Sequence, residues 1–197
     1  MKNILLFGGG LDSAFYFLHF IEKKMPFECL WVNYGQRTVM GEVSAMGKFC
    51  SKYRIKAHVV STDLISNYAA PNLLMRTGDN PFVEGRNLGL ALTALQYGDK
   101  IHMGFTDPGY TPFKDADKEF IENMNKVLSA SFAGKSVSAE LIHLNRQKLG
   151  QIFLAKEPDL FDMAFTCWES TSEEECGKCK HCISKQKMKE SICTKQE

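Results

Sequence analysis

Residues 4–13 read Ile4-Leu5-Leu6-Phe7-Gly8-Gly9-Gly10-Leu11-Asp12-Ser13, a short apolar run that passes through three glycines into an amphipathic segment. The apolar run predicts a buried strand, and residues 12–23, whose apolar side chains recur at helical spacing, predict a helix. Glycines between the two let the backbone turn tightly and approach a ligand. The helix N-terminus adds unpaired N–H groups and a partial positive charge, which suit phosphate. The sequence therefore predicts a strand, a phosphate-binding loop and a helix.

Two familiar phosphate loops do not match this stretch. A Walker A loop needs Gly-Lys-Ser/Thr, which is absent here, and Ser13 stands where a dinucleotide fingerprint has its third glycine. An ordinary strand–helix turn, with Asp12 or Ser13 as the N-cap, is the alternative interpretation. The loop alone therefore does not identify the ligand.

The same alternation of short apolar runs and amphipathic segments continues along the chain. Strands are predicted at residues 29–32, 58–60, 101–103 and 139–142, and helices at 39–53, 86–97, 118–131 and 145–155. Strands that alternate with helices predict an α/β fold, with a mainly parallel sheet and helices on both faces. Residues 66–82 form the one long irregular segment. We expect a single domain over residues 1–197.

The composition is that of a globular protein, and the odd number of cysteines, seven, favours a reducing compartment. Of 197 residues, 44% are hydrophobic and 24% are charged, and 24 basic against 23 acidic side chains leave a formal net charge of +1. This balance gives no reason to expect direct nucleic-acid binding. No stretch approaches the ~20 apolar residues of a membrane span, and the first apolar run is too short for a secretory leader. We expect a cytoplasmic protein, and a homodimer is compatible with the sequence.

Four of the seven cysteines have the spacing of a metal site. Cys167, Cys176, Cys179 and Cys182 fall within sixteen positions, and two Cys-x-x-Cys steps share Cys179. Four thiolates can close a tetrahedron around zinc at ~2.3 Å, and such a site has no open position, so the zinc should be structural. A redox Cys-x-x-Cys pair and an iron–sulfur cluster are the alternatives. We expect a zinc knuckle with a closing helix over residues 163–192.

Several motifs, in one order along the chain, resemble a known family. Residues 7–13, Phe-Gly-Gly-Gly-Leu-Asp-Ser, resemble the Ser-Gly-Gly-x-Asp-Ser loop of the N-type ATP pyrophosphatases, also called PP-loop proteins. Other segments resemble one family in that superfamily, the 7-cyano-7-deazaguanine synthases. They are residues 30–37 (Leu-Trp-Val-Asn-Tyr-Gly-Gln-Arg), residues 83–87 (Val-Glu-Gly-Arg-Asn), the segment 104–120 with Tyr110 and Asp115, and the pair Cys167-Trp168. The similarity spans about residues 3–190.

The resemblance implies an adenine nucleotide α-hydrolase-like fold and an ATP-dependent C–N ligase of queuosine biosynthesis. In the family's reaction, ATP adenylates the carboxylate of 7-carboxy-7-deazaguanine, ammonia displaces AMP to give the amide, and a second ATP drives dehydration to the nitrile. Mg²⁺ is expected with the ATP. The implied catalytic residues are Asp12, Ser13, Arg86 and Arg146. The implied ATP-binding residues are Phe7, Gly8, Gly9, Gly10, Leu11, Asp12, Ser13, Tyr34, Arg37, Arg86 and Asn87.

The chain departs from the family pattern around the expected site. Gly8 replaces the first serine of the loop, Thr38 replaces a histidine, and Asn145-Arg146 replaces a Thr-Lys step. Asp117-Lys118 stands where the family has Arg-Pro. These changes indicate a divergent member. Three alternatives therefore stay open: an enzyme that stops at the amide or conjugates a deazaguanine acid to an amine, a sulfur-transfer enzyme of the superfamily, and a non-catalytic nucleotide-binding protein.

Overall fold

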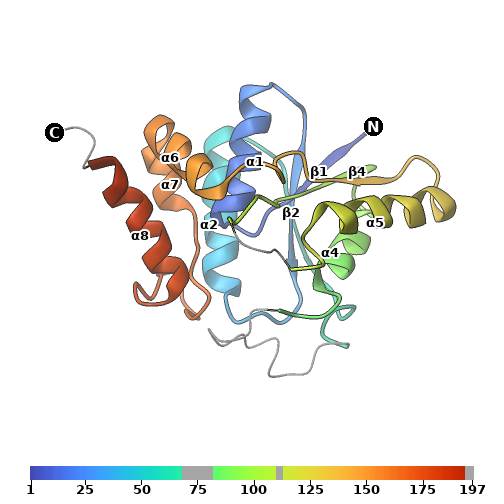
Figure 1. Ribbon diagram of the computed structural model, residues 1–197. Helices are drawn as coiled ribbons and strands as arrows, with labels where there is room; N and C mark the ends of the chain where they lie inside the picture. The colour runs from blue at the N-terminus through green and yellow to red at the C-terminus, as the bar shows by residue number, and fades with distance from the viewer. Residues whose placement is uncertain (68–81, 110–112, 194–197) are drawn as a thin grey trace.

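The computed structural model describes residues 1–67, 82–109 and 113–193 (Figure 1). Its strands are β1 (Asn3–Leu6), β2 (Glu28–Asn33), β3 (Ala57–Ser61), β4 (Lys100–Met103) and β5 (Ser136–Ser138). Its helices are α1 (Leu11–Glu22), α2 (Val39–Tyr53), α4 (Arg86–Ala94), α5 (Lys118–Ser131), α6 (Arg146–Lys156), α7 (Pro158–Met163) and α8 (Lys180–Cys193). Most of the irregular segment at 66–82 and Tyr110 lie outside the described residues.

The five strands form one sheet in the order β3-β2-β1-β4-β5, and every neighbouring pair is parallel. Strand β1 lies in the middle because Ile4 and Leu5 are fully buried and point to opposite faces of the sheet. Leu5 and Cys29 belong to the hydrophobic core on one face, whereas Ile4 and Leu30 belong to the core on the other. The prediction of a mainly parallel sheet is confirmed.

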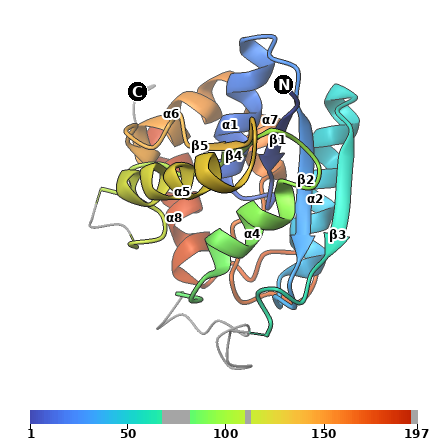
Figure 2. The ribbon, with the colours of Figure 1, turned by 90° about the vertical axis from the view of Figure 1, so that its right-hand side faces the viewer.

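Helices cover both faces of this sheet. Figures 1 and 2 show α1, α2, α6, α7 and α8 on one side and α4 and α5 on the other. The first side is packed mainly with aromatic rings: the centroids of Phe7, Phe17 and Phe49 lie 5.2–5.4 Å apart. Because Phe7 opens the glycine loop, this packing fixes where the loop leaves the sheet. The second core consists mainly of aliphatic side chains from β2, β4, α4 and α5.

The predicted strand at 139–142 is wrong. The edge strand β5 lies at Ser136–Ser138, and residues 140–143 form turns. Leu141 is nonetheless buried, and its backbone N–H donates to the Tyr16 hydroxyl at 2.8 Å. The run at 139–142 is apolar because the turn that it forms is buried. The strand itself is the short Ser-Val-Ser stretch, which has few apolar residues to reveal it. Sequence analysis also missed α7 and extended α4 by three residues.

The direction in which strands are added reverses beside β1, since β2 and β3 lie on one side of it and β4 and β5 on the other. Ligands bind in such parallel sheets at the carboxyl ends of the strands, where the reversal opens a crevice. Here the crevice is narrow at its base, because a Cβ on Gly104, just after β4, would lie 2.9 Å from the Ser13 Cα atom. None of the described helices has the length and apolar character needed to cross a membrane.

Candidate functional site

A cavity of about 370 Å³ lies at this carboxyl-terminal edge. Segments that follow β1, β2 and β4 contribute to its wall, together with the first residues of α4 and α6 and the segment 165–168. Its size falls in the usual range for a small-molecule site, ~300–1,000 Å³. Of the residues implied by the family resemblance, the lining includes Phe7, Gly8, Gly10, Leu11, Asp12, Ser13, Tyr34, Arg86, Asn87 and Arg146. Gly9 and Arg37 lie outside this lining.

The glycine loop is held by its backbone. Gly9 has a φ of +73°, and a Cβ there would lie 2.9 Å from both the Ala45 Cβ atom and the Glu42 carbonyl oxygen. The Gly9 carbonyl accepts a hydrogen bond from the Phe165 N–H at 2.8 Å. Gly8, in contrast, faces open space, because no atom of the described residues lies within 4 Å of the position that a Cβ would take. The loop is therefore rigid on its inner side and open toward the cavity.

The N-cap of α1 is Gly10, and no side chain among the described residues caps it. The Ser13 hydroxyl donates to the Gly10 carbonyl at 3.0 Å, and the Asp12 carboxylate has other partners. The alternative interpretation of Asp12 or Ser13 as an ordinary N-cap is therefore wrong. The first amides of a helix have no intrahelical acceptor, so this uncapped end is suited to an anion.

Asp12 lies between a cation and a hydroxyl. The Arg146 Nε atom is 2.9 Å from Asp12 Oδ1, but its N–H is not aligned for a hydrogen bond, so this contact is an ion pair. The Thr106 hydroxyl donates to the same oxygen at 2.6 Å. Asp12 and Arg146 were expected from the family resemblance, whereas Thr106 was not expected. The only signal for Thr106 was its position three residues after a predicted strand.

Arg86 and Asn87 begin α4 on the opposite wall. Their N-cap, Gly85, has a φ of +67°, which favours glycine. The Arg86 Nε–H donates to Asn87 Oδ1 at 3.1 Å, and the Asn87 amide donates to the Asp115 carbonyl at 2.8 Å. Asn87 is buried and thereby orients Arg86 at the cavity wall.

Glu42 holds the turn after β2 in place, and this role of Glu42 was not expected from the sequence. Its carboxylate accepts hydrogen bonds from Trp31 Nε1–H and the Gln36 amide at 3.0 Å each, and from the Thr38 hydroxyl at 2.5 Å. Gln36 in turn accepts from the Tyr34 N–H at 2.9 Å. Thr38, which replaces the family's histidine, therefore has a structural partner. The turn places Tyr34 in the cavity wall.

Arg37 points to the cysteine-rich segment instead. Its Nη1 atom lies 3.3 Å from the Glu169 carboxylate, and nearby the Ser44 hydroxyl donates to Glu173 at 2.7 Å. These two contacts fasten the segment 167–175 to the N-terminal half of α2 and the turn before it.

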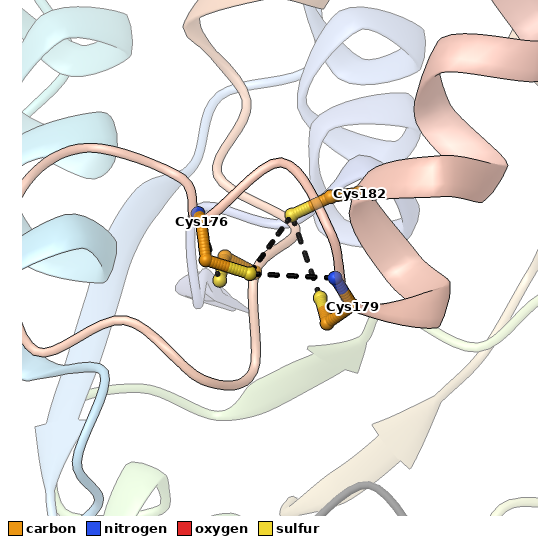
Figure 3. A group of neighbouring side chains, drawn as sticks. Cys176, Cys179 and Cys182 are labelled. Atoms are coloured by element: carbon orange, nitrogen blue, oxygen red, sulfur yellow. Dashed lines mark hydrogen bonds between the residues drawn. The ribbon is translucent and has the colours of Figure 1, made fainter.

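The four predicted metal ligands are brought together. The sulfur atoms of Cys167, Cys176, Cys179 and Cys182 all lie within 4.8 Å of one another. The Cys179–Cys182 and Cys176–Cys182 sulfur distances are 3.4 and 4.0 Å, and Figure 3 shows these three side chains converging. A tetrahedral ion with ~2.3 Å bonds to sulfur needs sulfurs ~3.8 Å apart. The arrangement therefore fits a single ion. A four-iron cluster binds each thiolate to a different iron and would hold the sulfurs farther apart.

Backbone N–H groups surround these sulfurs. The N–H groups of Glu169, Ser170 and Cys176 approach the Cys167 sulfur at 3.3–3.4 Å. Burial acts to raise the pKa of Cys176, but hydrogen bonds from the N–H groups of Lys178 and Cys179, together with those from the Cys167 and Cys179 thiols, lower this pKa to about 7. Gly177, with a φ of +71°, makes the reversal between the ligands. Burial raises the pKa of Cys167 and of Cys182, so it is at Cys176 that the thiolate, the form that binds a metal, is favoured.

The same segment supplies an aromatic part of the cavity wall. The rings of Trp168 and His181 are stacked, with centroids 3.6 Å apart, and both residues line the cavity. Behind them the buried Lys185 ammonium contacts Glu175 at 3.0 Å, and Glu175 also accepts from the Thr166 hydroxyl at 2.7 Å. The cysteine site therefore stabilises the wall as well as the C-terminal helix.

The fold is shared with two solved structures. The chain is similar to the U34-tRNA thiolase NcsA from Methanococcus maripaludis, solved with its 4Fe–4S cluster, with a TM-score of 0.53 and 15% identity over 98% of this chain. The chain spans 66% of that thiolase. The chain is also similar to a predicted subunit of a tRNA methyltransferase from Methanocaldococcus jannaschii, with a TM-score of 0.52 and 14% identity. That match covers 77% of this chain and 73% of the methyltransferase subunit. At these identities the likeness shows the fold alone.

Curated relatives are named 7-cyano-7-deazaguanine synthase. The protein from Lysinibacillus sphaericus is 29% identical over 94% of this chain and 93% of its own. Those from Methanocaldococcus jannaschii and Nitratiruptor are 27% and 25% identical, and each covers at least 90% of both chains. The family model described as queuosine biosynthesis protein QueC matches residues 2–192. The chain therefore belongs, as a divergent member, to the QueC family of ATP-dependent queuosine-biosynthesis ligases.

Proposed function

We propose that this chain converts 7-carboxy-7-deazaguanine and ammonia into 7-cyano-7-deazaguanine, with consumption of ATP, through an acyl adenylate and an amide. One observation carries the proposal. A glycine loop, an uncapped helix N-terminus and two arginines from distant segments line a single cavity in a chain that the QueC family matches over residues 2–192.

The phosphates of ATP are assigned to the loop from Phe7 to Ser13. The uncapped N-terminus of α1 provides N–H donors and a partial positive charge. The open space beside Gly8 gives a phosphate access to the backbone. Tyr34, at the end of the neighbouring strand, is assigned to the ATP side of the cavity.

Arg86 and Arg146 are assigned to the charge that develops during adenylation. Attack of the substrate carboxylate on the α-phosphate expels pyrophosphate, so negative charge accumulates on phosphate oxygens. Preorganised cations stabilise such charge most effectively, because they need no rearrangement during the reaction. Arg146 keeps a positive charge at neutral pH and cannot serve as an acid or a base there. Asn87 supports Arg86 in this role through the hydrogen bond between them. Arg37 is assigned an indirect role: its contact with Glu169 holds the cysteine-rich segment of the wall in place.

Magnesium is expected to accompany the ATP, where it would offset the negative charge of the phosphates. Asp12 is the carboxylate of the loop that suits this ion, because Mg²⁺ binds oxygen ligands and commonly uses one or two carboxylates together with phosphates. Ser13 lies at the same helix end. The acid substrate is assigned to the remaining wall, where Trp168 presents a flat aromatic ring beside the cavity.

We assign zinc to the four cysteines, because their sulfur separations suit one tetrahedral ion. With all four positions taken by protein, the ion supplies no chemistry to the reaction and has a structural role. We further propose that residues 1–197 form one domain, in which residues 163–192 make the knuckle and the closing helix.

The test is to incubate the purified protein with ATP, Mg²⁺, ammonia and 7-carboxy-7-deazaguanine, and to follow the products by mass spectrometry. The proposal expects AMP, pyrophosphate and the nitrile. AMP with amide alone, or AMP release accelerated by added amines, supports the conjugating alternative instead. No AMP with any deazaguanine acid, despite measurable ATP binding, contradicts a catalytic role.

Replacement of Gly8 by serine restores the hydroxyl that the family loop has at this position, and it tests how much turnover is lost without that hydroxyl. The space beside Gly8 accommodates the side chain without displacing a neighbour. One charged hydrogen bond contributes ~1.5–3 kcal/mol, so turnover should rise by no more than ~100-fold in Gly8→Ser. A non-catalytic protein would stay silent after this change.

A further inference from the structure

We propose that Thr106 is a positioning residue that, together with Arg146, fixes the carboxylate of Asp12 in the phosphate loop. The inference rests on the proposed function of that loop. Thr106 lies in the segment between β4 and α5, 94 residues from Asp12 in sequence, yet its hydroxyl donates to Asp12 Oδ1 at 2.6 Å. Both residues line the same cavity.

The two contacts on Asp12 have different physical characters. The Arg146 guanidinium approaches Oδ1 without hydrogen-bond alignment, so it attracts the carboxylate but fixes its direction weakly. The Thr106 hydroxyl makes a short and directional bond to the same oxygen. About a third of the Asp12 side chain is exposed, which leaves room for it to rotate. Thr106 therefore sets the orientation, and the second carboxylate oxygen is left for a ligand.

The backbone around Thr106 is built to hold it there. The Asp107 N–H donates to the Leu144 carbonyl at 2.9 Å, and the Arg146 N–H donates to the Asp107 carbonyl at 2.8 Å. Asn145, between these partners, caps α6 by accepting from two backbone N–H groups. Thr106 and Arg146 thus stand beside one short parallel bridge, and both side chains reach Asp12 from it. Two segments far apart in sequence act as one clamp.

The experiment compares three single variants by calorimetric titration with ATP in the presence of Mg²⁺. Thr106→Val keeps the side-chain shape and removes the donor, and it should weaken ATP binding about 10-fold or more. Thr106→Ser restores the hydroxyl and should recover most of the affinity. Thr93→Val is the matched control, because the Thr93 hydroxyl also donates a 2.8 Å bond, to the Gly89 carbonyl, but Thr93 lies outside the cavity lining. It should bind ATP as wild type does.

A double-mutant cycle with Asp12→Ala shows whether Thr106 acts through Asp12. In that background Thr106→Val should change neither the ATP affinity nor the urea midpoint of the free protein, since the acceptor is gone. The inference is overturned if Thr106→Val binds ATP normally, if serine fails to rescue it, or if the loss persists without Asp12. Wild-type protein that binds no ATP instead refutes the phosphate loop itself.

Discussion

At the scale of single residues, the loop depends on two adjacent glycines with opposite requirements. Gly9 has a positive φ and no room for a Cβ between Ala45 and the Glu42 carbonyl. An alanine there must adopt a left-handed conformation and push against backbone. We expect Gly9→Ala to lower the free energy of unfolding by about 2–4 kcal/mol, measured by urea denaturation, and to weaken ATP binding.

Gly8→Ala is the matched control for this prediction. In the part of the chain that the structure describes, a Cβ at Gly8 meets no atom within 4 Å, and the φ of Gly8 is not in the positive range. Its stability should stay within ~0.5 kcal/mol of wild type, as for a surface substitution. Equal stability losses in the two variants would mean that the loop is not fixed at Gly9.

The same scale shows what the sequence could and could not reveal about the site. The family resemblance implied roles for Asp12, Arg86 and Arg146, and all three line one cavity. Thr106 and Glu42 were missed because their roles come from tertiary contacts. A threonine after a strand and a glutamate on a helix are ordinary until the fold brings Asp12 and Trp31 to them. Short-range pattern carries no signal for such pairs.

At the scale of secondary structure elements, the cysteine knuckle joins the segment after α7 to the start of α8. Cys179→Ser should reduce the zinc content from about one per chain to near zero, because three thiolates hold the ion far less well than four. Elemental analysis of the purified protein measures this directly. The wall residues Trp168 and His181 are adjacent in sequence to the expected ligands Cys167 and Cys182. The contribution of Trp168 to the near-ultraviolet circular dichroism spectrum should therefore also change in Cys179→Ser.

Cys50→Ser is the control for the knuckle. Cys50 is buried on α2 and lies outside the four-sulfur group, so this variant should keep its zinc. Iron in the wild-type protein, or zinc that survives in Cys179→Ser, would contradict the assignment.

Elements with strong periodicity were predictable, and short edge elements were not. The strands β1 and β2 match their apolar runs because side chains on both of their faces are buried. Helix α2 matches its periodic pattern because one stripe of its surface is buried. Strand β5 has only three residues, of which Val137 alone is buried, so its hydrophobic signal was weaker than that of the turn beside it. The position of an edge strand is fixed by its neighbour β4, which a local pattern does not contain.

At the scale of the whole molecule, one buried histidine makes stability depend on pH. His102 on β4 is fully buried, packs against Phe20 with ring centroids 4.7 Å apart, and has Glu140 Oε1 3.6 Å from its Nδ1. Burial lowers the pKa of His102 from 6.5 to about 4, although Glu140 acts in the opposite direction. The folded protein therefore keeps His102 neutral in a range where the unfolded chain is protonated.

The sign of the effect follows from this difference. Well above pH 6.5 neither state binds the proton, and the full stability is present. As the pH falls from 6.5 toward 4, the unfolded state gains protons first, so the free energy of unfolding decreases. The two pKa values give a loss of about 2 kcal/mol at pH 5.

The measurement is urea denaturation at pH 7.5 and pH 5 for wild type, His102→Gln and His143→Gln. Glutamine at position 102 is polar but does not titrate, so that variant should lose about 2 kcal/mol less than wild type between the two pH values. His143 is exposed on the turn after β5, and its replacement should leave the pH dependence as in wild type. Acid also protonates the cysteine thiolates and weakens metal binding, but equally in all three proteins, so the comparison removes this contribution. The same pH dependence in His102→Gln and wild type would show that His102 takes up its proton without unfolding, through a rearrangement around Glu140.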